Sequence, residues 1–161
     1  MALKGHRRTV AQDISFFMDE VAERGGPVLF STAGSGAALD DSSALVTYPS
    51  HLVNPAGTSV RICPGVLMND MVNLDQTRQH INFHKDEVQK GGKVTLLQEG
   101  EILTDRIDAN VTPALNDIAY CSSSGFFTNS ATPENGPIVG HFMSTKDEDG
   151  YAKIYVKVPN R

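Results

Sequence analysis

The chain has 161 residues, of which 40% are hydrophobic and 20% charged, and its formal net charge is −5 at pH 7. This length and composition are typical of one globular domain with a buried core, and no apolar run is long enough to cross a bilayer. The acidic balance argues against a nucleic-acid-binding protein, because a basic face supplies most of the affinity in that class.

The chain begins with a short basic segment. Residues 1–12 carry Lys4, Arg7 and Arg8 and no acid. No apolar stretch follows them, so the segment is not a secretory signal. Such a segment is either a solvated tail or a leader that docks on an acidic protein surface.

The residues after this leader predict a short helix. Asp13 is a suitable N-cap, and Gly25-Gly26 would end the helix. Apolar residues between them recur at helical spacing, and the stripe would be buried on the domain's own core or on a partner. We therefore expect residues 1–26 to form an N-terminal arm with a short helix. The stripe consists of Ile14, Phe17, Met18 and Val21.

Residues 27–161 read as a single β-domain. Short apolar runs separated by tight turns predict strands throughout, and the last of them, 151–158, alternates cleanly between its two faces. Glu99-Gly100, residues 122–125 and residues 146–150 have the composition of hairpin turns. The fold class expected is mainly β, and the short strands at close spacing indicate a small antiparallel barrel or sandwich.

A long polar excursion interrupts this β-domain at residues 69–92. Loops longer than about a dozen residues are usually functional or disordered. Apolar residues recur through this one, and it lacks Gly, Ser or Pro runs. We therefore interpret it as an ordered central loop held against something outside the domain.

Two histidines in the excursion are the main candidates for chemistry. His80 and His84 stand four residues apart, which is metal-ligand spacing on a helix, but Ile81 occupies the position of the zincin glutamate. Asp86 and Glu87 could complete a structural metal site, although contacts to a neighbouring subunit are the preferred interpretation. Neither a catalytic constellation nor a cofactor motif is found, so we expect no cofactor and no enzymatic activity.

The remaining motifs have simpler interpretations. The acidic run at residues 147–150 lacks the spaced ligands of an EF-hand and predicts a turn. Cys63 and Cys121 lie in apolar or Ser-rich strand contexts without metal-type spacing. They are interpreted as free buried thiols of a protein made in a reducing cytoplasm, rather than as a disulfide.

Two stretches resemble virion structural proteins of tailed bacteriophages, and specifically the small capsid decoration (cement) proteins. They are GVLMNDMVNLDQTRQHINFHKDEVQKGGKVTLL (65–97) and PIVGHFMSTKDEDGYAKIYVKV (137–158). The opening MALKGHRRTVAQDISFFMDEVAERGG is similar to the leaders of the same group, and together the three cover about half the chain.

This resemblance implies a small antiparallel β-barrel or tulip-like body with an N-terminal arm. It also implies a homotrimer on the outer surface of the phage head that bridges neighbouring major capsid protein subunits, without nucleic acid or membrane as partner. The arm and the excursion would then make the contacts to the shell or within the trimer. The residues expected to do so are Arg7, Arg8, Phe16, Phe17, Met18, Asn73, Asp75, Arg78, His80, Phe83 and His84.

Three other functions are left open by the sequence. A tail or portal-vertex protein would share the β-body and the lack of a catalytic motif. A small β-barrel hydrolase could use His80 or His84. A glycan-binding module is disfavoured by the absence of tryptophan, because sugar sites favour large aromatic platforms.

Overall fold

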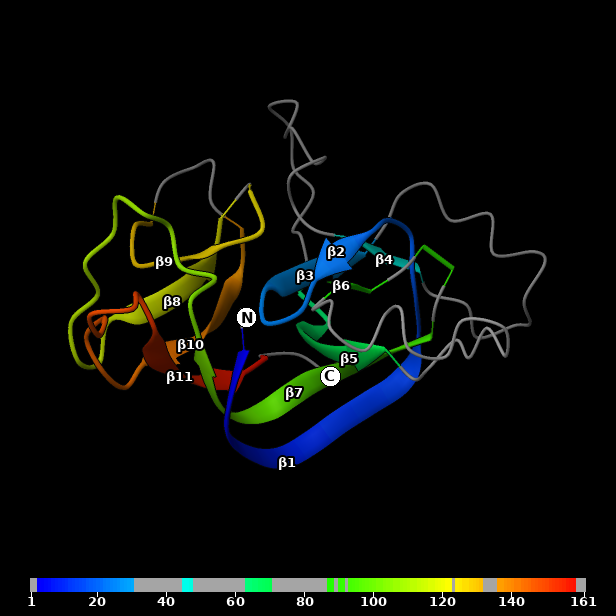
Figure 1. Ribbon diagram of the computed structural model, residues 1–161, viewed down its shortest axis with the longest axis horizontal. Helices are drawn as coiled ribbons and strands as arrows, with labels where there is room; N and C mark the ends of the chain where they lie inside the picture. The colour runs from blue at the N-terminus through cyan, green and yellow to red at the C-terminus, as the bar shows by residue number, and fades with distance from the viewer. Residues whose placement is uncertain are drawn as a thin grey trace.

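Figure 1 shows the computed structural model of the protein, which is built from β-strands. The structure describes residues 3–30, 45–47, 63–70, 87–88, 90–91, 93–122, 124–131 and 136–158. The mainly β fold class predicted from the sequence is confirmed, because the described residues form a nearly closed, largely antiparallel β-barrel sheet. The strands of the described part are β1 Leu3–Met18, β2 Ala22–Glu23, β3 Pro27–Phe30, β4 Leu45–Thr47, β5 Gly65–Asp70, β6 Glu87–Val88, β7 Lys93–Thr104, β8 Ile118–Cys121, β9 Phe127–Thr128, β10 Ile138–Phe142 and β11 Ala152–Lys157. Of these, β2 and β6 pair only with each other in a separate two-stranded sheet.

The main sheet has the strand order β1-β4-β3-β5-β7-β11-β10-β8-β9, and β1 also pairs with β7. The extra pairing closes β1, β4, β3, β5 and β7 into a ring, in which only the β1–β4 pair is parallel. At the far end of the sheet, β9 returns to the chain just after β7 through a parallel bridge between Ile107 and Phe127. The molecule therefore consists of two curled sheets that share β7, and Figure 1 shows the second one at the left.

The shared strand β7 pairs with different neighbours along its two halves. Its first half, from Val94 to Leu97, pairs with β5, and its second half, from Glu99 to Thr104, pairs with β11. Leu96 and Leu97 are consecutive and both fully buried, because they point to opposite faces of the strand and enter different cores. The wall made by β7 and β5 thus separates two hydrophobic clusters.

The first cluster fills the ring and the second fills the curled sheet of β8–β11. Burial of this many apolar side chains is the main stabilising term of the fold. Members of the first are Phe16, Met18, Ala22, Val28, Leu67, Val94 and Leu96. Members of the second are Leu29, Cys63, Val66, Met68, Leu97, Ile102, Ile107, Ala119, Cys121, Phe127, Val139, Phe142, Ala152, Ile154 and Val156.

The helix expected after Asp13 is wrong, since β1 continues to Met18 and a turn with Gly25 at φ 96° follows. A helix would have buried Ile14 and Val21, yet their side chains are 48% and 56% exposed. A short helix is marginal alone, whereas pairing with β7 satisfies a whole row of backbone groups.

The N-terminal arm is also corrected, because the first strand belongs to the body of the protein. β1 pairs with β7 from the Leu3–Thr104 partners to the Phe17–Lys93 partners, as Figure 1 shows along the lower edge of the view. Residues 1–26 are therefore not a separate unit in front of residues 27–161. Without β1, one edge of β7 would lose its hydrogen-bonding partner.

Two of the three expected hairpin turns are confirmed. Gly125 and Gly150 have φ values of 80° and 85° in turns closed by bonds from their N–H groups to the carbonyls of Ser122 and Asp147. The third is wrong, because β7 runs straight through Gly100. Residues 71–86 of the expected excursion lie outside the described part, and its later portion returns as β6, which pairs with β2.

Candidate interaction surface

The structure places the expected contact residues of β1 in two different environments. Arg8 is exposed, and Phe17 is half-buried. Phe16 and Met18 are 6% and 0% exposed in the core, so their assignment as contacts to a partner is wrong. Arg7 pairs through its backbone with Ile102. The remaining expected contacts, Asn73, Asp75, Arg78, His80, Phe83 and His84, lie outside the described residues.

One edge of β1 is open over most of its length in the described part of the chain. β7 occupies the other edge, and β4 reaches only Phe17 and Met18. Val10 on this strand is 56% exposed and Arg8 is exposed as well. An unpaired edge offers backbone donors and acceptors to another chain, although the four register shifts against β7 restrict which strand could fit.

The outer face of the β7–β11–β10–β8 sheet carries an in-register row of side chains. Arg8 is the cross-strand partner of Glu101, and Glu101 is the partner of Tyr155. Tyr155 in turn lies opposite His141, which lies opposite Ile118. The row therefore crosses five strands from a cation through a carboxylate and two aromatic rings to an exposed aliphatic side chain.

Hydrogen bonds and ion pairs hold the polar half of this face in place. The Tyr155 hydroxyl donates to Glu99 Oε1 at 2.9 Å, and Lys153 Nζ lies 2.8 Å from Glu101 Oε2. The hydrogen bond to Glu99 is the largest cause of a raised pKa at Tyr155. The Tyr155 and His141 rings are in contact, with centroids 5.2 Å apart and planes tilted by 38°. These contacts fix the positions of Tyr155, Glu99, Lys153 and Glu101 on the outer face.

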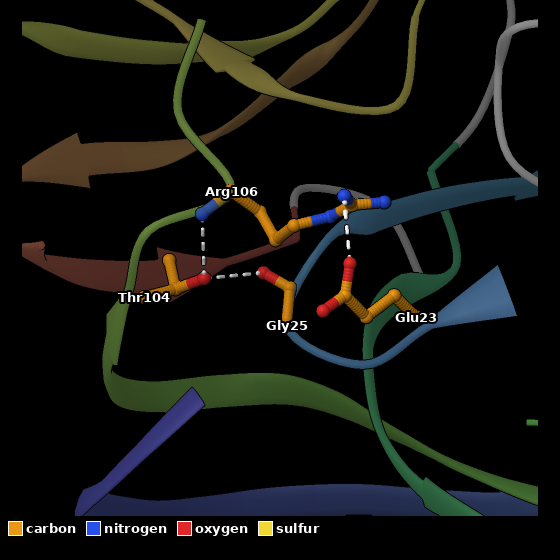
Figure 2. Close-up of polar contacts among 4 residues, drawn as sticks. All are labelled: Glu23, Gly25, Thr104 and Arg106. Carbon is orange, nitrogen blue, oxygen red and sulfur yellow. Dashed lines mark hydrogen bonds and ion pairs between the residues drawn. The ribbon is translucent and has the colours of Figure 1, made fainter. Parts of the chain in front are cut away.

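A second polar cluster joins the end of β7 to the turn after β2 (Figure 2). The Thr104 hydroxyl donates to the Gly25 carbonyl at 3.0 Å and accepts from the Arg106 N–H at 3.1 Å. The Arg106 guanidinium lies 3.0 Å from Glu23 Oε2 and 4.7 Å from the centre of the Phe126 ring. Each group is held by neighbours of the same chain, so the cluster fastens the two curled sheets together.

The cysteines are free and buried, as predicted. Burial raises the pKa of the Cys63 thiol from 9.0 to about 12, and its Sγ donates to the Gly65 carbonyl at 3.2 Å. A thiol in this state is not ionised at neutral pH, and the thiolate is the nucleophilic form. Cys63 is therefore a core residue.

The described residues contain no metal-binding cluster, and the chain has no match among known proteins. Within the described ranges, no three or more His, Cys, Asp or Glu side chains form a group that could hold a metal ion. The same part of the chain contains no helix long and apolar enough to span a membrane. The chain matches no protein-family model, no curated protein and no solved structure.

Sequence reasoning found part of the outer face and missed the rest. The alternation of the last strand correctly put Lys153, Tyr155 and Lys157 on one face, although Tyr151 is buried instead of joining them. Their partner Glu101 was missed because Gly100 was assigned to a turn, which hid the alternation of β7. If residues 99–104 are taken as one strand, Glu99 and Glu101 fall on the same face, opposite Lys157 and Tyr155 of β11.

Proposed function

We propose that this protein is a structural component of a tailed-phage virion that binds the outer surface of the head and stabilises it by bridging major capsid subunits. It would be made in the host cytoplasm, act as a homotrimer and remain on the capsid exterior without an enzymatic role. The resemblance of residues 65–97 and 137–158 to decoration proteins is the starting point of this proposal.

The observation that supports it best is the open, basic edge of β1. Arg8 is exposed, and residues 1–12 carry three cations and no acid in a chain of net charge −5. A cationic strand edge on an otherwise acidic protein suits an acidic protein surface, because complementary charge steers docking and strand addition supplies backbone hydrogen bonds. In this proposal the exposed Arg8 contacts the shell.

The architecture is also suited to a mechanical role. β7 belongs to both curled sheets and pairs with β1, β5 and β11, so a force applied at β1 is shared by strands of both cores. Each bond to the shell needs only a modest area when several subunits are engaged at once, because linked contacts reinforce one another.

The test is co-sedimentation of the purified protein with heads that lack it. Wild-type protein should pellet with the heads, and Arg8→Glu should reduce the bound fraction several-fold because it places a carboxylate against an acidic surface. Lys93→Glu is the matched control, since Lys93 is an exposed cation at the other end of the β1–β7 pair. A wild-type protein that stays in the supernatant at all concentrations contradicts the proposed function.

A further inference from the structure

We propose that copies of this chain contact one another through the apolar half of the outer face of the β7–β11–β10–β8 sheet, close to the symmetry axis of the assembly. This inference rests on the proposed function for its homotrimer and names the surface that forms it. The surface, called here the β8–β10 patch, consists of Ile118, Tyr120, Ile138, His141 and Tyr155.

The register of three strands brings these side chains together. Between β8 and β10, Ile118 is the cross-strand partner of His141, and Tyr120 is the cross-strand partner of Ile138. On the other side of β10, Tyr155 of β11 lies opposite His141, and their two rings are in tilted contact. Their strand neighbours Ala119, Cys121, Val139, Phe142 and Val156 point inward and are fully buried. The five patch residues therefore share the solvent side of the sheet.

The patch combines two exposed isoleucines with three half-buried rings on one face of the sheet. Ile118 and Ile138 are 45% and 43% exposed, while Tyr120, His141 and Tyr155 are half-buried. Leu115, three residues before Ile118, is 64% exposed. Isolated exposed apolar residues are ordinary, but a group of them enriched in tyrosine is typical of the centre of a protein–protein interface.

The charges beside the patch favour a second copy of this chain as its occupant. Glu99 and Glu101 lie on β7 and Lys153 and Lys157 on β11, so the rim carries two charges of each sign. A rim of this kind can meet its own copy without net repulsion, although the whole chain is acidic. The open edge of β1, with its excess of cations, is the part suited to a different and acidic surface.

The rim is also held in place before any partner arrives. Tyr155 is hydrogen-bonded to Glu99, and Lys153 is paired with Glu101 at 2.8 Å. Side chains that are already fixed lose little conformational entropy when an interface forms. An interface that buries the two isoleucines inside this fixed rim has an apolar centre and a polar border.

Sedimentation-velocity ultracentrifugation of the full chain over a range of concentrations tests this inference. The wild type should sediment as a species heavier than the 17.4 kDa monomer. Ile118→Glu and Ile118→Lys should each weaken association by about 30-fold or more, because a charge would be buried at the centre of the contact. Since the patch meets its own copies, opposite charges can pair across the contact, and an equal mixture of the two variants should associate more strongly than either variant alone and so recover part of the assembly.

The control is Val21→Glu, which changes an aliphatic side chain of similar exposure, 56%, outside the patch and should leave association unchanged. Thermal unfolding of each variant checks the fold, and Ile138→Lys replaces any variant that fails to fold. A monomeric wild type, variants that assemble normally, or a mixture that does not recover assembly would each overturn the inference.

Head co-sedimentation with the same proteins separates the two proposals. Wild-type protein that binds heads as a monomer overturns the patch contact and the homotrimer, and leaves the head-binding role standing. Patch-dependent assembly without head binding does the reverse. Patch variants that assemble normally but no longer bind heads would assign the patch to the shell and overturn the contact between copies.

Discussion

Replacement of Gly100 by alanine should destabilise the protein more than replacement of any exposed turn glycine. Gly100 lies in the middle of β7 with φ 153°, a conformation that side chains rarely adopt. A Cβ atom there would collide with the Arg8 carbonyl oxygen of β1 and lie 3.2 Å from Leu97 Cδ1. The collision is with backbone, which cannot rotate away, so β1 and β7 would have to separate locally.

The magnitude follows from two terms. Holding a non-glycine residue in such a backbone conformation costs about 1–3 kcal/mol. Overpacking against fixed neighbours costs about another 1–3 kcal/mol. Gly100→Ala should therefore lower the free energy of unfolding by about 2–6 kcal/mol, a large fraction of the stability of a domain of this size.

Urea denaturation followed by circular dichroism measures the effect. Gly91→Ala is the matched control, because Gly91 has φ 77° but nothing within 4 Å of an added Cβ, so it should lose only about 1 kcal/mol. The difference between the two variants isolates the close approach of β1 to β7. Equal losses for the two variants would refute the packing of Arg8 against Gly100.

Three further predictions concern the cores and the junction. Phe142→Ala should cost about 3–5 kcal/mol because Phe142 is fully buried, whereas Val21→Ala, at an exposed position outside the patch, should stay below about 1 kcal/mol in the same denaturation assay. A double-mutant cycle of Glu23→Gln and Arg106→Gln should give a coupling energy of about 1 kcal/mol that falls with added salt, and additive losses would contradict the pair. The unfolded state loses the Cys63 proton above pH 9.0, while the folded state keeps it up to about pH 12. Stability should therefore fall in this window by about 1.4 kcal/mol per pH unit, and Cys63→Ala should remove that share of the slope.

The strands of the second curled sheet were predictable from the sequence because their patterns are local. In β11 the buried Ile154 and Val156 alternate with Lys153 and Tyr155, as the sequence pattern predicts. Gly150, in the turn before this strand, has the positive φ expected of a turn glycine. In such strands one face is exposed to solvent and the other is buried, so polar and apolar residues alternate with a two-residue period in the sequence.

The first strand and the shared strand were not predictable in the same way. Phe17 and Met18 fit a helical stripe, and only the distant partner strand β7 decides against it. Leu96 and Leu97 break the alternation of apolar and polar residues because both faces of β7 are buried at this point. In the sequence, Gly100 is typical of a turn. In the structure, glycine is required there because a Cβ atom would collide with the Arg8 carbonyl oxygen of β1. Each error arises from a contact between residues far apart in sequence.

The pairing of β1 with β7 also constrains how the chain is made. The first strand leaves the ribosome long before its partner, since Arg8 must wait for Glu101 to be synthesised. Until then an unpaired strand with the apolar residues Phe16, Phe17 and Met18 is open to aggregation. The cations at its start are then useful during synthesis, because charges that flank an apolar strand act as gatekeepers against mispairing of nascent chains.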